Sequence, residues 1–308
     1  MNHKTKFAAH LSTIAMGLSL LVACESESSR NHRAAIEYIR TGIAAYAQGD
    51  LDSAIAACTK AIQIDPGFSK SYFNRGLYRA KKGEVHKAIE DFTENARLDA
   101  DKSPGLFERA ICYAKMGDVD KAIADYDEVL QLDPNNADAL FNRSLALFEK
   151  GNLRSAIIDA SKIIRLDPSN PESYLVRSNY FTEISNFELA LIDLDEAIRL
   201  DPRFAEAYFN RALIYLGMQK YDQAIGDISR SIELDSSDAR AFAIRGYAYV
   251  KQDEFEKAIA DLTEAITLDP NESRFYSYRA KAYRGVDDNI RAEQDEAKTR
   301  ELKDKEWM

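Results

Sequence analysis

The sequence predicts an all-α fold in which pairs of helices stack along the chain as a solenoid. An aspartate that ends an apolar helical segment recurs every 34 residues without insertion or deletion, at Asp65, Asp99, Asp133, Asp167, Asp201, Asp235 and Asp269. A pair made of alanine and a larger aliphatic residue recurs in the same phase, from Ala54-Ile55 to Ala258-Ile259. Because one such segment cannot bury its apolar face alone, neighbouring segments are expected to share a continuous core.

Within each 34-residue repeat the pattern predicts two helices and a tight turn between them. Small residues recur at the eighth and twentieth positions, where the two helices of a pair must approach closely. Glycine occupies the fifteenth position, where the first helix must end, at Gly49, Gly83, Gly117 and Gly151. Proline follows the closing aspartate and stops the second helix at Pro66, Pro134, Pro168, Pro202 and Pro270. The pattern therefore predicts about eight helix pairs, or about sixteen helices.

These repeats resemble the tetratricopeptide repeat (TPR), a helix-turn-helix unit of 34 residues. Besides alanine at position 20, the resemblance rests on a large residue at position 4: Tyr38, Tyr72, Leu106, Leu140, Tyr174, Tyr208, Phe242 and Tyr276. The resemblance implies a right-handed superhelical solenoid. Its repeats would span residues 35–68, 69–102, 103–136, 137–170, 171–204, 205–238, 239–272 and 273–306.

The first residues have the pattern of an export signal, and we do not expect them to belong to the folded domain. Two lysines precede an apolar run that is too short for a comfortable transmembrane helix and ends in Leu21-Val22-Ala23-Cys24. This ending resembles the lipobox of bacterial lipoproteins, which implies a signal peptide over residues 1–23 and acylation of Cys24. Residues 24–34 then form the acylated cysteine and a polar tether. In that family a glutamate such as Glu25 after the cysteine favours the outer membrane, here on its periplasmic side.

The composition excludes several functional classes. The chain has 41 Lys and Arg against 51 Asp and Glu, a net charge of −10, which argues against a nucleic-acid binder. Three cysteines cannot make a disulfide framework or a four-thiolate zinc site, and we expect Cys58 and Cys112 to be separate buried thiols. The chain lacks phosphate loops, nucleophile elbows and paired histidines. We therefore expect no catalytic residues, metal or cofactor.

Arginine at position 7 and aspartate at position 23 recur together in every repeat after the first. The arginines are Arg75, Arg109, Arg143, Arg177, Arg211, Arg245 and Arg279. The aspartates are Asp91, Asp125, Asp159, Asp193, Asp227, Asp261 and Asp295. The first repeat breaks both rules at once, with Thr41 and Ala57, which indicates that each arginine contacts the aspartate of its own repeat. A feature repeated this often predicts a structural ion-pair ladder rather than a site.

Aromatic and amide side chains recur along the predicted first helices. In TPR proteins, first-helix positions 2, 5, 6, 9, 12 and 13 face a concave groove that takes peptide ligands. The resemblance therefore implies a peptide-binding track formed by Phe73, Asn74, Phe107, Phe141, Asn142, Phe209 and Asn210. An apolar stripe flanked by amides suits an extended or helical segment. The alternative is that the phenylalanine rings fill space between first helices and belong to the core.

A second groove type in the family, the carboxylate clamp, grips a C-terminal carboxylate with basic and asparagine side chains. One window matches in part, with Asn179, Asn210 and Arg240. Leu175 and Ile244 occupy the other two clamp positions, and the loss of two cations weakens anion capture. The sequence therefore favours an apolar track over a clamp.

The expected function is the binding of partner proteins at a membrane. The chain resembles outer-membrane TPR lipoproteins that act as adaptors and bring peptidoglycan hydrolases to a periplasmic protease. A second class of such lipoproteins assists the assembly of secretins, pili or outer-membrane barrels. We expect a protein-protein interaction scaffold with cell-envelope proteins or peptides as partners, and homo-oligomers are compatible with it. The alternatives are an assembly factor and an enzyme.

Overall fold

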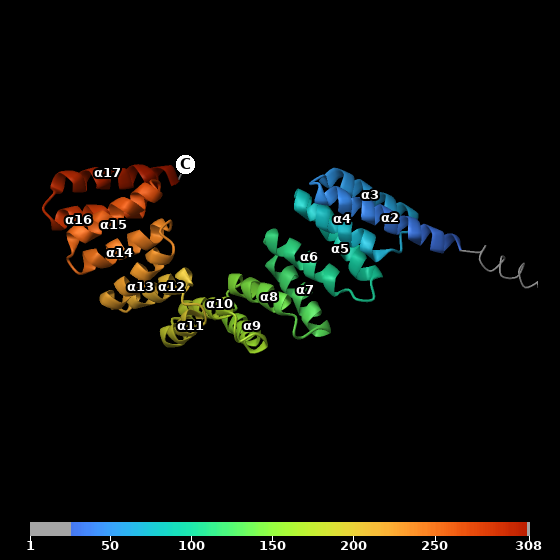
Figure 1. Ribbon diagram of the computed structural model, residues 1–308, viewed down its shortest axis with the longest axis horizontal. Coiled ribbons are helices and arrows are strands. Elements are labelled where there is room, and N and C mark those ends of the chain that lie inside the picture. Colours follow the sequence, from blue (N-terminus) through green and yellow to red (C-terminus); the bar gives the residue numbers. More distant parts are fainter. Residues whose placement is uncertain (1–25, 307–308) are drawn as a thin grey trace, which may run out of the picture. The chain divides into compact units, whose positions relative to one another are not determined.

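The computed structural model describes residues 26–306 (Figure 1). This part of the chain contains sixteen α-helices and no strand, which confirms the predicted all-α class. The predicted signal peptide and Cys24 lie outside the described residues. The chain divides into two compact units, with the boundary between Lys150 and Gly151, and each is described by itself.

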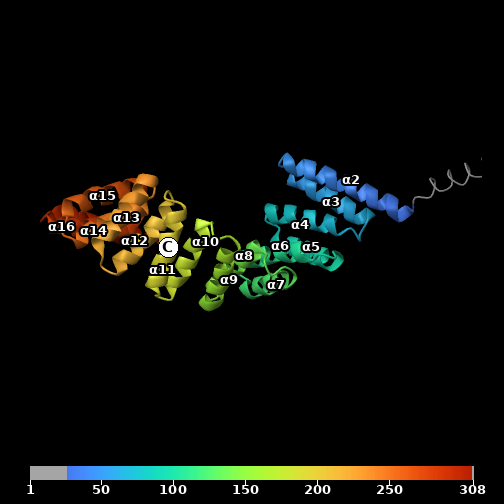
Figure 2. The ribbon, with the colours of Figure 1, turned by 60° about the horizontal axis from the view of Figure 1, so that its bottom comes forward.

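The N-terminal unit consists of three helical hairpins and one further helix. Its helices are α2 (Glu27–Ala47), α3 (Leu51–Ile64), α4 (Ser69–Lys82), α5 (Val85–Leu98), α6 (Ser103–Lys115), α7 (Val119–Leu132) and α8 (Ala137–Glu149). The hairpins are α2–α3, α4–α5 and α6–α7, and each packs on the next (Figure 2). Contacts between α2 and α4, α4 and α6, and α6 and α8 bring consecutive first helices together.

The C-terminal unit begins with one helix and continues with four hairpins. Its helices are α9 (Leu153–Leu166), α10 (Pro171–Glu183), α11 (Phe187–Leu200), α12 (Ala205–Gly217), α13 (Tyr221–Leu234), α14 (Ala239–Lys251), α15 (Phe255–Leu268), α16 (Ser273–Gly285) and α17 (Asn289–Glu306). The hairpins run from α10–α11 to α16–α17, and the first helices α14 and α16 also contact each other. None of the described helices is long and apolar enough to cross a membrane.

Small side chains allow the two helices of each hairpin to approach closely. The alanine at position 20 is at most 1% exposed in every repeat, from Ala54 to Ala292. At position 8, a Cβ added to Gly76 would lie only 2.7 Å from the ring of Phe92. A Cβ on Gly42 would lie 3.2 Å from the carbonyl oxygen of Ala54. A larger residue at either position would push the hairpin open, because the space is already filled.

In the turn after each first helix, the residue at position 15 has a left-handed backbone conformation in all eight repeats, although it is glycine in only four of them. Gly49, Gly83, Gly117 and Gly151 have φ between +77° and +86°. In the later repeats the same position is Ser185, Gln219, Asp253 and Asp287, with φ near +58°. A non-glycine residue adopts this conformation at a modest energetic cost, and the packed hairpin imposes it. Glycine was therefore a sufficient sequence signal for this turn but not a necessary one.

The N-terminal boundary of the fold differs from the prediction. Residues 27–34, which we assigned to a tether, form the first turns of α2. The Ser26 hydroxyl accepts a hydrogen bond from the backbone N–H of Ser29 and caps the helix. One turn later, His32 hydrogen-bonds the Asp65 carboxylate at 2.7 Å, and its ring packs edge-on against Phe68 at 4.6 Å. Contacts with the end of the first repeat thus extend the helix into a segment that looks polar and unstructured in sequence.

Candidate functional site

The predicted ladder of arginines and aspartates exists and lies within single repeats. The six pairs that the structure describes in full are Arg75–Asp91, Arg109–Asp125, Arg177–Asp193, Arg211–Asp227, Arg245–Asp261 and Arg279–Asp295, with closest N–O distances of 2.6–2.8 Å. All six aspartates are buried, at most 9% exposed. The hydrogen bonds that Arg245 donates to the Asp261 carboxylate raise the pKa of Arg245 above its usual value. These carboxylates are committed to the scaffold and are not available as a catalytic group.

Each of the seven arginines at position 7, Arg143 included, has a partner in the preceding repeat that the sequence reasoning missed. Its Nη1 donates to a hydroxyl or carboxylate at position 25 of the preceding repeat, at 2.6–3.3 Å. The acceptors are Thr59, Thr93, Asp127, Ser161, Asp195, Ser229 and Thr263. The restriction of position 25 to Thr, Ser and Asp in these seven repeats was the available signal. One guanidinium therefore ties two successive repeats together.

In the N-terminal unit the three predicted groove phenylalanines differ in exposure. Phe73 is half-buried, with its ring edge-to-face on Phe92 at a centroid distance of 6.0 Å. Phe107 is also half-buried and meets Tyr126 in the same way at 5.9 Å. Phe141 is 40% exposed. Phe73 and Phe107 therefore contact the core, as the alternative prediction expects, whereas Phe141 lies at the surface.

Phe209, in the C-terminal unit, is mainly a core residue. It is 8% exposed and packs in a cluster with Ala212, Ala224, Ile228 and Ala241. The same ring also reaches a cavity on the first-helix side, described below. The burial of the residue at position 5 thus changes from repeat to repeat.

The predicted asparagines are partly engaged by the protein itself. Asn74 and Asn142 each donate one amide N–H to the carbonyl four residues earlier in their own helix, at 2.8 and 2.9 Å. Asn210 donates to the Oδ1 atom of Asn179 at 3.1 Å. The side-chain oxygens of Asn74 and Asn142 remain available as acceptors for a ligand backbone N–H.

The C-terminal unit contains an apolar cavity of about 210 Å³ that is lined by first helices alone. Three consecutive repeats contribute to it. The lining residues are Phe209 and Leu213 from α12, Arg240, Ala243 and Ile244 from α14, and Arg274, Phe275 and Tyr278 from α16. This composition, an apolar floor with a few polar groups at the rim, is typical of a site for a side chain of a peptide ligand.

The two arginines at the rim of this cavity are held by acidic residues of their own. Arg240 hydrogen-bonds Asp238 through Nη2 at 2.8 Å, and its guanidinium lies 5.1 Å from the centre of the Phe209 ring. Arg274 donates to both carboxylate oxygens of Glu272, at 3.0 and 3.1 Å. The pairing lowers the pKa of Glu272. Because Asp238 already neutralises Arg240, the arrangement gives no support to a clamp built on Asn179, Asn210 and Arg240.

Of the cavity residues, the sequence reasoning placed only Phe209 in the peptide-binding track, and it named Arg240 only as part of the incomplete clamp. It missed Leu213, Ile244, Phe275 and Tyr278. The signal was present for three of them, because Leu213 stands at position 9 and both Ile244 and Tyr278 stand at position 6 of their repeats, which face the groove in TPR proteins. The exception was Phe275 at position 3, which only the packing of α14 on α16 brings to the cavity.

The described part of the chain contains no cluster of metal ligands, and its two cysteines are buried. Among residues 26–306 there is no group of His, Cys, Asp and Glu suited to hold a metal ion. Cys58 and Cys112 are free, buried, and belong to different core clusters, as we expected. Burial raises the pKa of Cys58 to about 12 and that of Cys112 to about 11, which makes both thiols poor nucleophiles.

Comparisons with known proteins agree with this architecture. Crystal structures with the same fold include a tetratricopeptide repeat protein from Parabacteroides merdae (TM-score 0.61, 23% identity, 81% of this chain and 99% of that one). A second is the C-terminal part of a TPR repeat-containing protein from Cytophaga hutchinsonii (TM-score 0.66, 18% identity, 78% and 98%). A third is MamA from Desulfovibrio magneticus (TM-score 0.51, 22% identity, 55% and 96%). No curated protein matches the sequence significantly.

Sequence models of the repeat match most of the helical region. Models described as tetratricopeptide repeat match residues 35–68, 57–90, 137–170, 205–238 and 239–272, and a model described as TPR repeat matches 112–151. Four of these matches coincide with the repeat boundaries predicted from the aspartate spacing. With the hairpins, the small residues between them and the solved structures, they show that this chain belongs to the tetratricopeptide repeat family.

Proposed function

We propose that this protein is a membrane-anchored scaffold of the bacterial cell envelope that binds a segment of a partner protein on its first-helix face. The observation that carries the proposal is the cavity between α12, α14 and α16. It is lined by apolar side chains of three successive repeats and lies entirely within one compact unit. A side chain of a bound segment would gain about 25 cal/mol for each Å² of apolar surface buried there.

The fold supports a binding role rather than catalysis. TPR proteins generally mediate protein-protein or peptide interactions, and the TPR fold is typically a non-catalytic scaffold. The buried carboxylates of the ladder are each paired with an arginine, and the buried thiols have raised pKa values. These groups therefore stabilise the packing of the repeats.

The membrane attachment rests on the sequence alone. Leu21-Val22-Ala23-Cys24 follows an apolar run, and acyl chains on Cys24 would supply the anchor, since each buried CH₂ contributes about 0.8 kcal/mol. We place the protein on the periplasmic side of the outer membrane because glutamate follows the cysteine. The proposed partners are envelope proteins, with peptidoglycan hydrolases or a protease as the adaptor reading implies.

A photo-crosslinking experiment in intact cells tests the binding surface. The photoreactive residue p-benzoylphenylalanine replaces Leu213, which is 39% exposed at the cavity. The matched control carries it at Ile192, which is 56% exposed on the second helix α11. Crosslinked partners are identified by mass spectrometry. Specific adducts at Leu213 that are absent at Ile192 support the proposal.

The identity of the captured protein distinguishes the two roles. Hydrolases or a protease indicate an adaptor, whereas secretin, pilus or barrel subunits indicate an assembly factor. Equal crosslinking at the two positions would contradict the proposal that the cavity is the binding surface. A Leu213→Asp substitution should also remove the adducts of a reporter placed at Tyr278, and Ile192→Asp should leave them in place.

A further inference from the structure

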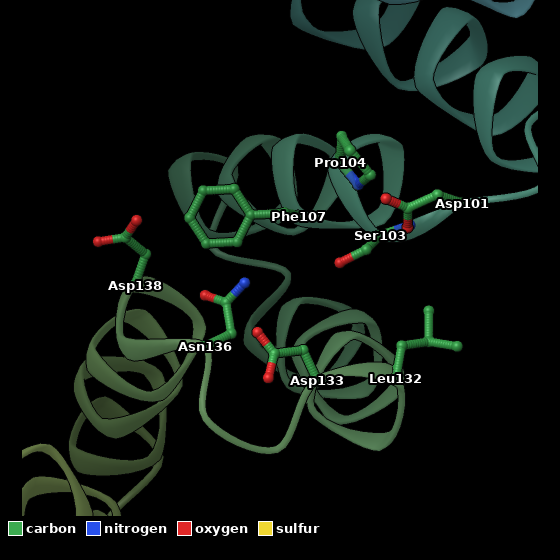
Figure 3. A pocket seen from close by; sticks show the side chains of 8 residues that line it. All are labelled: Asp101, Ser103, Pro104, Phe107, Leu132, Asp133, Asn136 and Asp138. Carbon is green, nitrogen blue, oxygen red and sulfur yellow. The ribbon is translucent and has the colours of Figure 1, made fainter. Parts of the chain in front are cut away.

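The N-terminal unit contains a second cavity, which the proposed binding surface does not include. Its volume is about 460 Å³. The lining residues are Asp101, Ser103, Pro104 and Phe107 at the start of α6, Leu132 and Asp133 at the end of α7, and Asn136 and Asp138 at the start of α8. Figure 3 shows the Phe107 ring projecting from α6 toward Asn136, with Asp138 on one side and Asp101 and Ser103 on the other.

Three carboxylates and no cation line this cavity. Asp101 and Asp133 each accept one backbone hydrogen bond from their own loop, from Ser103 at 3.1 Å and Asn135 at 3.0 Å. Those bonds orient the two carboxylates, and their second oxygens have no partner among residues 26–306. The Asp138 carboxylate makes no ion pair or hydrogen bond with any described residue. The nearest lysine in sequence, Lys102, is paired with Glu128 and does not line the cavity.

An aromatic face accompanies the negative charge. The Phe107 ring meets Tyr126 of the core edge-to-face, which fixes its position, and its remaining surface lines the cavity. A fixed aromatic ring beside unpaired carboxylates is a favourable environment for a cation, because the ring face attracts positive charge and the carboxylates accept its hydrogen bonds.

The C-terminal unit holds the equivalent cavity three repeats later, and there an arginine of the chain itself is one of the lining residues. This cavity, of about 330 Å³, is lined by Phe209, Asp235, Asp238 and Arg240 among others. They occupy the repeat positions of Phe107, Asp133, Asn136 and Asp138, each 102 residues later in the sequence. Arg240 lies over the Phe209 ring at 5.1 Å and hydrogen-bonds Asp238 at 2.8 Å.

We propose that the cavity at Phe107 binds an arginine side chain of a partner protein, in the place that Arg240 takes in the equivalent cavity. Position 2 of the repeat is arginine in one cavity and Asp138 in the other, so the chain supplies a cation to the lining of the first cavity and none to that of the second. The inference rests on the proposed function, because it names one side chain of the segment bound. Arginine fits better than lysine, since its planar fork can stack on Phe107 while it donates to two carboxylates.

Methyl NMR on the purified protein tests this inference with two small probes. The probes are acetyl-arginine methylamide and its neutral isostere acetyl-citrulline methylamide. The reporter is the methyl signal of Leu132, which lines the cavity and is 51% exposed. We expect the arginine probe to shift this signal. The citrulline probe should bind at least about fivefold more weakly than the arginine probe. Binding of the arginine probe should also weaken with added salt.

Two charge-reversal variants on α8 complete the test. Asp138→Arg places an arginine at the repeat position that Arg240 takes in the equivalent cavity, removes one carboxylate, and should abolish the shift of Leu132. Glu149→Arg makes the same change of charge at the opposite, exposed end of the helix and should leave it intact. Equal affinities for the two probes, or an unchanged shift in Asp138→Arg, would overturn the inference. Failure here would leave crosslinking at Leu213 in the other unit unaffected, so the two proposals can fail separately.

Discussion

Arg245 in α14 donates two hydrogen bonds to the buried carboxylate of Asp261 in α15, at 2.7 Å from Nε and 2.9 Å from Nη2. The third nitrogen, Nη1, donates to the hydroxyl of Ser229 in the preceding repeat at 3.1 Å. The pair fixes the two helices of one hairpin, and the third bond joins that hairpin to its neighbour. The same geometry recurs along the chain, so the register of stacking is set by directional bonds as well as by apolar contact.

A double-mutant cycle should show that this ion pair acts within the repeat. Removing one partner of a buried pair costs about 3–5 kcal/mol, and solvent access to the half-buried Arg245 reduces that cost. We expect a coupling free energy of about 2 kcal/mol between Arg245→Ala and Asp261→Ala. Urea unfolding of the two single variants and the double variant measures it.

The control cycle pairs Arg245→Ala with Asp227→Ala, the equivalent aspartate of the preceding repeat. Asp227 is bonded to Arg211 instead, at 2.7 Å. Its coupling with Arg245 should be small, below about 0.5 kcal/mol. A control coupling as large as that of Asp261 would show that the ladder runs between repeats in solution.

The buried thiols should make the protein lose stability at high pH. Because burial raises the pKa of Cys58 to about 12 from 9.0, the unfolded chain releases this proton at a lower pH than the folded one. Its stabilising contribution is complete below pH 9 and decreases above it by about 1.4 kcal/mol per pH unit. Urea midpoints between pH 8 and 10.5 should fall faster for the wild type than for Cys58→Ala. Parallel pH profiles for the two proteins would refute this linkage.

Identical substitutions of two phenylalanines should separate core from surface. Phe209→Ser opens a cavity among Ala212, Ile228 and their neighbours, and large core truncations cost about 3–5 kcal/mol. Phe141→Ser removes a ring that is 40% exposed, and we expect a loss of about 1 kcal/mol or less. Thermal melting of the two variants gives the comparison. Similar losses in both would mean that Phe141 is covered in solution.

Cys24→Ala should release the protein from membranes. In the wild type, acyl chains on Cys24 would hold it in the outer-membrane fraction even after a high-salt wash, because that attachment is apolar. The variant should move to the soluble periplasmic fraction, whereas Cys58→Ala should remain with the membrane. Fractionation followed by immunoblotting measures both. A variant that stays in the washed membrane pellet would exclude the lipid anchor.

Much of the fold follows from one-dimensional spacing. The aspartates 34 residues apart predict where each second helix ends, and the second helices α3, α5, α7, α9, α11, α13 and α15 do end at the residue before them. The alanines at position 20 predict the close approach within each hairpin, because only a small side chain fits there. The pairing of arginine with aspartate was predictable because the first repeat lacks both. Local signals of this kind suffice where each repeat contacts only its neighbours.

The site was less predictable because one sequence position serves different surroundings in different repeats. Phe141 and Phe209 both stand at position 5, yet one is 40% exposed and the other 8%. Their burial depends on the side chains that the neighbouring helices bring against them. The helical start of α2 escaped prediction for the same reason, since His32 is held by Asp65 and Phe68 from the far end of the repeat.

The sequence by itself determined the helical class, the repeat length, the residues that close each hairpin and the partners within the ladder. Each of these depends on spacing along the chain and on residue size or charge. The tertiary structure alone decided which cavities form and which side chains line them. Arg240 and Asp138 occupy the same repeat position, but only the folded structure shows that the guanidinium of the first lies over the Phe209 ring while the second lines a cavity beside Phe107. Cavity chemistry arises from side chains of three or more helices meeting in space, and the order of residues within a single repeat does not contain it.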